Sequence, residues 1–271
     1  MWQKEQNASA NHGSFSCAAP FAMPGIACAA VLPILLLLTR SFSRHWYWPQ
    51  VLPHEFSLRA WSYVIESSSG IPSALATSVK IALIVTVVSL LVSLPAARVI
   101  ALEEFRGKRL VLVLLMLPVL APPLASAMGL HALFLRLMLT DSIWGVILVH
   151  LVPSVPYCTL MLVSSFANFD SDFEDQARTL GAGPGRVFWH ITLPAIAPGM
   201  AVAAGFAFLV SWSQYLVTLF IGGGRTVTMP MLLIAMQRGG DQAATAAVAI
   251  VFLAPTIFVL AMVARFLRTT S

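Results

Sequence analysis

Charged residues are scarce in this chain. Only 10% of the 271 residues are Asp, Glu, Lys or Arg, whereas 58% are hydrophobic and the mean hydropathy is +0.84. A soluble globular domain has about 25% charged residues, so this chain has too little polar surface to fold as one. The sequence therefore predicts an integral membrane protein. Its net charge of +5 fits basic residues at membrane edges, and it has no basic run with interleaved aromatics, so no nucleic-acid partner is expected.

The sequence also lacks the signatures of an enzyme. It contains no G-x-x-x-x-G-K-[ST] phosphate loop, so any ATP must be bound by a partner subunit, and we expect no cofactor on this chain. His54-Glu55 is not followed by the second histidine of a zinc protease, and no metal site is expected. The apolar runs contain no Asp or Glu and there is no G-x-S-x-G elbow, which argues against an intramembrane protease.

Six apolar runs are long enough to cross a bilayer, which takes about 20 residues each. They cover about residues 20–39, 79–97, 110–134, 143–166, 197–219 and 243–263. The first could also be a signal peptide, but basic Arg40 and Arg44 follow it instead of a small-residue cleavage site. Prolines predict breaks in the third run, at residues 118–123, and in the fourth, at residues 153–156.

These runs predict an all-α, polytopic membrane fold with six transmembrane helices. Residues 1–19 would form an N-terminal tail and residues 20–267 the transmembrane domain. Basic residues concentrate on the cytoplasmic side of membrane proteins. Four of them fall within residues 98–109, so we expect this side, and both termini, to be cytoplasmic. Nine basic residues would then be inside: Lys4, Arg98, Arg106, Lys108, Arg109, Arg178, Arg186, Arg265 and Arg268.

A polar, Gly- and Pro-rich segment, residues 171–199, separates the fourth and fifth runs. Ser171 and Glu174 have the spacing of a capping box, which predicts a short helix that Gly181 ends. Gly183-Pro184 favours a second short helix, and Leu193-Pro194 a turn back into apolar sequence. The segment therefore predicts two short helices beside the membrane.

The same segment carries a spaced motif. Asp175-Gln176-Ala177 is followed after three residues by Gly181 and after nine more by Ile191-Thr192-Leu193-Pro194. This pattern resembles the E-A-A-x3-G-x9-I-x-L-P loop of the membrane-spanning subunits of ATP-binding-cassette (ABC) importers. Asp175 replaces the glutamate of the motif, and Gln176 replaces its first alanine. We place the corresponding coupling loop at residues 168–196, between the fourth and fifth spans.

The resemblance implies a permease subunit in a bacterial inner membrane. Its partners would be a cytoplasmic ABC ATPase dimer, a second permease, an external solute-binding protein and the lipid bilayer. Residues 56–61 and 211–230 resemble the polyamine (spermidine/putrescine) branch of these permeases. This resemblance implies that the second permease is a different chain and not a second copy of this one. The residues expected to couple to the ATPase are Glu174, Asp175, Gln176, Ala177, Arg178, Gly181, Ile191, Leu193 and Pro194.

A polar cluster in the fifth run, formed by Ser211, Trp212, Gln214 and Tyr215, is costly in lipid unless it faces protein or water. It could line a substrate pathway or hydrogen-bond to another helix, and the sequence leaves both open. Two other functions also remain, a secondary transporter and a non-transport membrane anchor. The first would need its own coupling site, usually an intramembrane acidic residue, and the second would not need the spaced loop.

Overall fold

The computed structural model describes residues 31–44, 46, 50, 53 and 55–270. These residues form helices joined by short links, with one isolated β-bridge between Ser43 and Phe56. The predicted all-α membrane fold is therefore confirmed. The predicted tail, residues 1–19, and the first part of the first apolar run lie outside the described residues.

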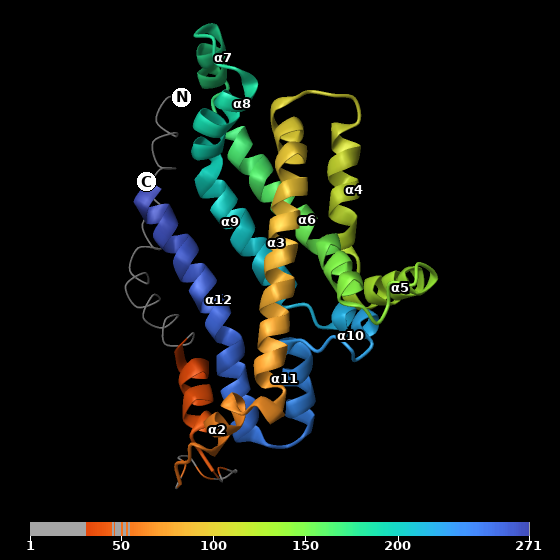
Figure 1. Ribbon diagram of the computed structural model, residues 1–271, viewed down its shortest axis with the longest axis vertical. Helices are drawn as coiled ribbons and strands as arrows, with labels where there is room; N and C mark the ends of the chain where they lie inside the picture. The colour runs from red at the N-terminus through yellow and green to blue at the C-terminus, as the bar shows by residue number, and fades with distance from the viewer. Residues whose placement is uncertain (1–30, 45, 47–49, 51–52, 54, 271) are drawn as a thin grey trace, which may run out of the picture.

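Long helices standing side by side make up the body of the molecule (Figure 1). Four helical stretches are long and apolar enough to cross a membrane, and they correspond to the second, fourth, fifth and sixth predicted runs. Helices α3, α6 and α9 pack against one another at the centre, and α12 packs against α9. Their bounds are Ile71–Leu102 for α3, Ile143–Ala167 for α6, Leu193–Trp212 for α9 and Gln242–Thr270 for α12.

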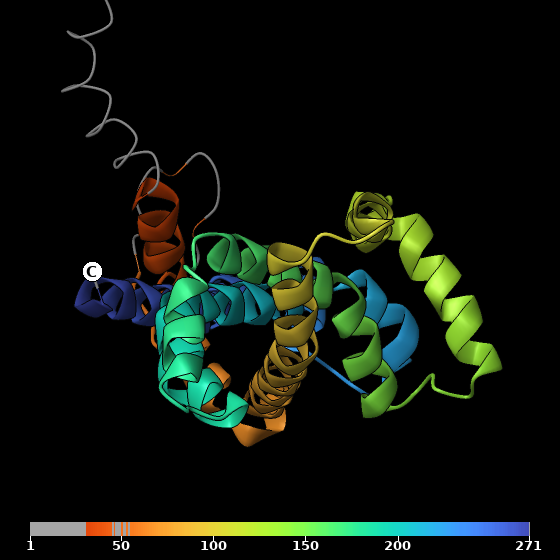
Figure 2. The same ribbon diagram turned by 90° about the horizontal axis from the view of Figure 1, so that it is seen from above.

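The third apolar run is split into two helices. Helix α4 covers Lys108–Leu120, helix α5 covers Pro123–Arg136, and their axes differ by 100°. The chain is extended at Ala121 and Pro122, because a residue that precedes proline disfavours the helical conformation. Figure 2 shows α5 pointing away from the central helices. If this bent pair counts as one span, the described part of the chain has up to five.

The number of spans remains a prediction. In the first run the described residues form a helix over Val31–Ser41, which at 1.5 Å per residue is about 16 Å long and too short to cross a bilayer alone. The count of six would need the preceding residues, which are outside the described part of the chain.

The predicted break in the fourth run is wrong. Helix α6 continues through both Pro153 and Pro156. Its residues on this stretch are packed between α3 and α9, and Ser93 of α3 donates a hydrogen bond to the Val155 carbonyl at 3.2 Å. Prolines are tolerated inside membrane helices that pack against neighbours, so the enclosure of α6 by α3 and α9 explains why this helix stays intact.

Short helices gather at the two ends of the bundle (Figure 1). At one end lie α7 and α8, close to the C-terminal end of α3. At the other end lie α2 and α11, close to the start of α3, while α10 lies near α5. The short elements are α2 Arg59–Ile65, η1 Ser67–Ser69, α7 Asp172–Thr179, α8 Pro184–Val187, η2 Phe188–Thr192, α10 Leu216–Gly222 and α11 Met229–Arg238.

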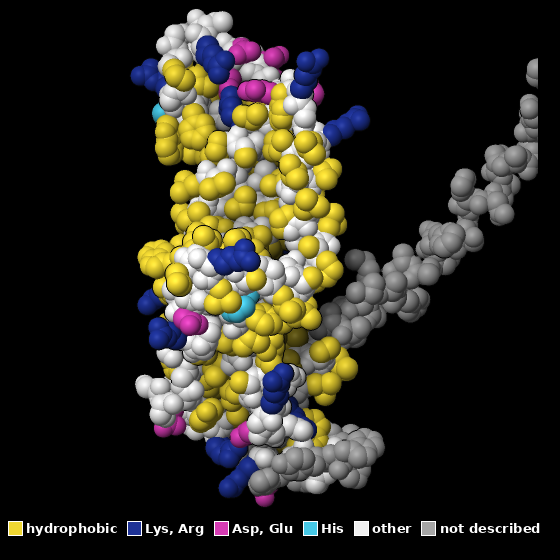
Figure 3. Space-filling model, turned by 90° about the vertical axis from the view of Figure 1, so that its right-hand side faces the viewer, with side chains coloured by type: hydrophobic (Ala, Val, Ile, Leu, Met, Phe, Trp, Pro, Cys, Tyr) yellow, Lys and Arg dark blue, Asp and Glu magenta, His cyan; other side chains and the backbone are white. Residues whose placement is uncertain are grey.

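The surface matches a protein that crosses a membrane. Figure 3 shows hydrophobic side chains over the middle of the molecule, with most charged side chains toward the two ends and a smaller group between them. Four basic residues fall within residues 98–109, at the α7 end of the molecule, where α3 ends and α4 begins. The elements at that end contribute Arg98, Arg106, Lys108, Arg109, Arg178, Arg186, Arg265 and Arg268.

Candidate functional site

Helix α7 begins differently from the prediction. Ser171 is its N-cap residue, but its backbone is helical (φ −66°, ψ −18°) and its side chain makes no capping hydrogen bond. The Asp170 carboxylate accepts a hydrogen bond from the Asp172 amide instead, at 3.0 Å. The predicted capping box of Ser171 and Glu174 is therefore wrong, because the Glu174 side chain is engaged elsewhere.

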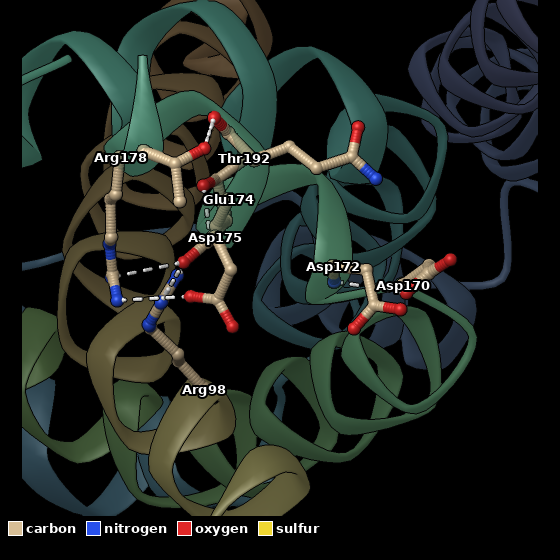
Figure 4. Close-up of polar contacts among 9 residues, drawn as sticks. Arg98, Asp170, Asp172, Glu174, Asp175, Arg178 and Thr192 are labelled. Carbon is tan, nitrogen blue, oxygen red and sulfur yellow. Dashed lines mark hydrogen bonds and ion pairs between the residues drawn. The ribbon is translucent and has the colours of Figure 1, made fainter. Parts of the chain in front are cut away.

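Glu174 is buried under the end of α3, with 3% of its surface exposed. Its two carboxylate oxygens accept hydrogen bonds from both terminal nitrogens of Arg98, at 2.8 and 2.6 Å, and the Thr192 hydroxyl donates a further one (Figure 4). The Arg98 guanidinium lowers the pKa of the Glu174 carboxyl to about 2, although burial alone would raise it. A two-point ion pair thus joins α7 to α3 and η2.

The opposite side of α7 faces outward. Asp175, Gln176 and Arg178 are exposed, and Arg178 reaches Asp175 and Glu174 at 3.4 Å each. The Arg178–Asp175 pair is exposed on both sides and contributes little to stability, so Asp175 can change partners at low cost. The candidate coupling residues therefore divide into an inward group, represented by Glu174, and an outward group that a second protein could contact.

Helix α7 ends at Gly181, as the sequence predicts. The Gly181 amide donates to the Arg178 carbonyl and the Ala182 amide to the Ala177 carbonyl, both at 3.0 Å, which is the Schellman arrangement. Gly181 has a φ of +85°, a left-handed conformation that glycine adopts without strain. A Cβ atom at Gly181 would have nothing within 4 Å, so the requirement for glycine within this chain is conformational.

The second half of the loop is a continuous helix instead of a separate short one. The predicted turn at Leu193-Pro194 is wrong, because α8, the π-helical turn η2 and α9 follow one another without interruption from Pro184 to Trp212. Ile191 lies in η2, and Pro194 follows this π-helical turn inside the continuous helix. The fifth span therefore extends out of the bundle and carries this part of the loop rigidly.

Three large apolar side chains at this end of the molecule were not among the sequence-derived candidates. Phe173 in α7 is 57% exposed, Leu180 just after α7 is 87% exposed, and Trp189 in η2 is 64% exposed. Isolated apolar residues in a polar segment were the signal that could have identified them. Exposed apolar residues such as Phe173 and Leu180, in a polar segment beside the membrane-spanning helices, are typical of a protein contact surface.

A second candidate site is a cavity of about 880 Å³ beside the C-terminal end of α9. It lies among α4, α5, α6 and the residues that join α9 to α10. Most of its lining is apolar, and the polar side chains that line it are Ser126, Tyr157, Ser213, Gln214 and Tyr215. Gln214 and Tyr215 of the predicted pathway cluster thus lie in one cavity, together with Ser126 and Tyr157, which the sequence reasoning missed.

Ser211 and Trp212, the other two members of that cluster, do not line this cavity. Trp212 is 2% exposed, stacks on Phe208 and Phe252, and donates its indole hydrogen to the Phe252 carbonyl at 3.2 Å. Ser211 is also buried and hydrogen-bonds to His150. The two alternatives for the cluster therefore apply to different members, since one pair faces the cavity and the other packs between helices.

Comparison with known proteins identifies relatives of this chain. A molybdenum transport system permease protein of Mycobacterium tuberculosis is 33% identical over 71% of this chain and 77% of its own length. A spermidine/putrescine transport system permease protein of Haemophilus influenzae is 26% identical over 77% of this chain and 80% of its own. The crystal structure of a bacterial ABC transporter involved in alginate import has a chain with the same fold, at a TM-score of 0.65 and 17% identity, over 92% of this chain and 95% of that one.

The family model for binding-protein-dependent transport system inner membrane components matches residues 90–271. That region is about two thirds of the chain and contains α7, the Arg98–Glu174 pair and the cavity. The relatives are transport permeases and are not themselves enzymes. The chain belongs to the family of binding-protein-dependent transport system inner membrane components, and it is a multi-pass permease subunit of an ABC importer.

Proposed function

We propose that this chain forms one half of the translocation pathway of an ATP-driven importer and receives the motion of a partner ATPase through α7. The observation that supports this proposal is the two-sided construction of α7. Its inner side is fastened to α3 by the Arg98–Glu174 pair, while Asp175, Gln176 and Leu180 are exposed on its outer side. Force applied to the outer side would reach a membrane-spanning helix directly.

The α7 end of the molecule would face the cytoplasm. The cluster of four basic residues within residues 98–109 supports that orientation, because short cytoplasmic loops are rich in Lys and Arg. Helix α12 ends on the same side, so the C-terminus would also be cytoplasmic. An ATPase dimer in the cytoplasm would then have access to Asp175, Ala177, Arg178 and the exposed apolar residues.

The complete importer would contain further subunits. We propose a second permease, different from this chain, to complete the pathway, an ATPase dimer to bind ATP, and an external solute-binding protein to select the solute. The cavity supports selection of the solute by the binding protein and not by this chain, because no charged side chain lines it. A pathway with neutral hydroxyl and amide groups can pass a polar solute without holding it tightly.

For the solute, the polyamine-type segments and the spermidine/putrescine relative support a polyamine. The molybdenum relative, which is more similar, supports an oxyanion as the second candidate. The cavity also favours the second candidate, since its lining offers hydroxyl and amide hydrogens to an oxyanion and no carboxylate to a polycation.

Reconstitution tests both parts of the proposal. The chain, its partner permease, the ATPase and the binding protein would be assembled in lipid vesicles, and uptake of labelled spermidine and of labelled molybdate would be compared with and without ATP. Uptake without ATP would contradict ATP-driven import, and no uptake of either solute by an intact complex would rule out both candidate solutes. Uptake of one solute but not the other assigns the solute class.

The docking surface is tested by Leu180→Asp, which places a carboxylate in the exposed apolar surface. We expect this variant to lose ATPase binding by at least about tenfold, since apolar anchors dominate contact energies. Leu58→Asp is the matched control, because Leu58 is 68% exposed at the other end of the molecule. Equal ATPase binding by the two variants would rule out α7 as the docking element.

A further inference from the structure

The helical chain breaks between α9 and α10, and the link at this break carries three of the polar groups of the cavity. Helix α9 ends at Trp212 and α10 begins at Leu216, and Ser213, Gln214 and Tyr215 between them all line the cavity. A break in a membrane-spanning helix leaves backbone groups unpaired, and each unpaired group is costly away from water. A side chain of the neighbouring helix α6 contacts the helices on both sides of this break.

His150 of α6 supplies these contacts. The imidazole is buried, with 2% of the residue exposed, and it lies between the two helices that flank the break. Its Nδ1 atom is 2.9 Å from the Ser211 hydroxyl in the last turn of α9, and its Nε2 atom is 2.8 Å from the Thr218 hydroxyl in the first turn of α10. One side chain thus connects both sides of the break to α6.

The directions of these hydrogen bonds follow from the third partner. The Thr218 hydroxyl donates its hydrogen to the Gln214 carbonyl, at 3.0 Å, so it must accept from Nε2 of His150. A neutral imidazole with its hydrogen on Nε2 has a free electron pair on Nδ1, which then accepts from the Ser211 hydroxyl. The order is therefore Ser211 to His150, His150 to Thr218, and Thr218 to the backbone of Gln214.

This series of hydrogen bonds ends at a residue of the cavity wall. Gln214 is fixed through its carbonyl, while its side chain lines the cavity. In the described part of the chain no other histidine has both ring nitrogens bonded to side chains. His131 of α5, by comparison, lies 5.8 Å from the Phe220 ring and its Nδ1 atom has no hydrogen-bond partner.

We propose that His150 is a positioning residue of the permeation pathway, which holds the break between α9 and α10 and so places Gln214 and Tyr215 at the cavity wall. This inference rests on the proposed function of the cavity as the pathway. His150 would act only through Ser211, Thr218 and the backbone, without touching the solute. Rigid placement matters here because the cavity contains few polar groups to guide a polar solute.

Thiol labelling tests the placement directly. In the assembled complex, with Cys17, Cys28 and Cys158 replaced by alanine, Gln214→Cys would be labelled with a small cationic methanethiosulfonate reagent. This substitution leaves the Gln214 carbonyl in place. The labelling rate would then be measured after adding Thr218→Val, which removes two hydrogen bonds at nearly constant volume, or His150→Leu. His131→Leu is the matched control, because it removes a histidine that does not join the break.

We expect Thr218→Val and His150→Leu to change the labelling rate by about fivefold or more, in the same direction, and His131→Leu to leave it within about twofold. If the complex with His150→Leu does not assemble, the labelling rate of Thr218→Val alone tests whether His150 positions Gln214. Equal rates in Thr218→Val and the starting protein would overturn the role of His150 alone. If Gln214→Cys is not labelled even without a second substitution, the cavity is not an accessible pathway, and both proposals fail.

Discussion

Replacing Glu174 with glutamine should release α7 from α3. The substitution keeps the size of the side chain and removes its charge, so Arg98 loses the two-point ion pair and Thr192 faces an amide. Breaking a buried pair from one side is more damaging than removing both partners, because the remaining charge is left without compensation. We therefore expect local destabilisation of α7 without a change in membrane insertion.

The size of this destabilisation follows from the pKa of the Glu174 carboxyl. Hydrogen bonds from Arg98 lower this pKa from 4.5 to about 2, and at 1.36 kcal/mol per pKa unit the difference corresponds to about 3 kcal/mol. The Arg98 side chain is 33% exposed, so water compensates part of the loss. We expect the free energy of opening α7 to fall by about 2–3 kcal/mol, which accelerates amide hydrogen exchange by about 30- to 150-fold.

The assay is hydrogen exchange of the α7 backbone amides in the purified subunit or complex. Asp175→Asn is the matched control, since Asp175 carries the same charge on the same helix but its side chain is 70% exposed, and it should change the exchange rate by no more than about fivefold. If Glu174→Gln accelerates exchange no more than Asp175→Asn does, the ion pair does not hold α7 and the reasoning is refuted.

The same experiment has a pH dependence with a definite sign. Because the folded-state pKa of Glu174 lies below its usual value, its contribution to stability is complete above pH 4.5 and is lost as the pH falls toward 2. The difference in α7 exchange between the wild type and Glu174→Gln should therefore be constant near neutral pH. It should shrink progressively when both proteins are compared at pH values below about 5.

Two further predictions concern the docking surface and the cavity. Gly181→Asp and Ala177→Asp should abolish transport and uncouple the ATPase without affecting membrane insertion. Each places a charge at the docking surface, and Gly181→Asp also strains the left-handed backbone at the end of α7. Wild-type transport by either variant would contradict the docking assignment. Trp212→Ala should destabilise the fold by about 3–5 kcal/mol, since Trp212 is buried between two phenylalanines, whereas Tyr215→Ala should reduce uptake with less loss of stability. Thermal unfolding and vesicle uptake would separate these two effects, and the opposite pattern would reverse their assigned roles.

Much of the fold could be predicted from the sequence, because the hydropathy of each run of residues can be read without knowing how the chain folds. Four predicted runs coincide with long apolar helices, and the third forms the bent pair α4 and α5. The prolines were harder to interpret. The helix breaks before Pro123, whereas Pro118 lies inside α4, and Pro153 and Pro156 lie within a continuous helix that α3 and α9 enclose. The outcome depended on packing partners that are distant in the sequence.

The sequence predicted where α7 ends, but not which way its side chains face. The end of α7 at Gly181 depends on local backbone geometry, and local geometry is readable from the residue type. The inward position of Glu174 depends on Arg98, which is 76 residues away in the chain. The spacing in the sequence instead predicted that Glu174 forms a capping box with Ser171, three residues away, whereas its partner in the structure is Arg98.

The sequence by itself determined that this chain is a membrane protein, that it carries a spaced loop between two spans, and that it has no phosphate loop for ATP. Only the tertiary structure decided which polar residues face the cavity and which face other helices. In a membrane both the lipid-facing and the protein-facing sides of a helix are apolar, so periodicity cannot distinguish them. The separation of Gln214 and Tyr215 from Ser211 and Trp212, and the contacts of His150 across the helix break, therefore depend on how α6, α9 and α10 pack together.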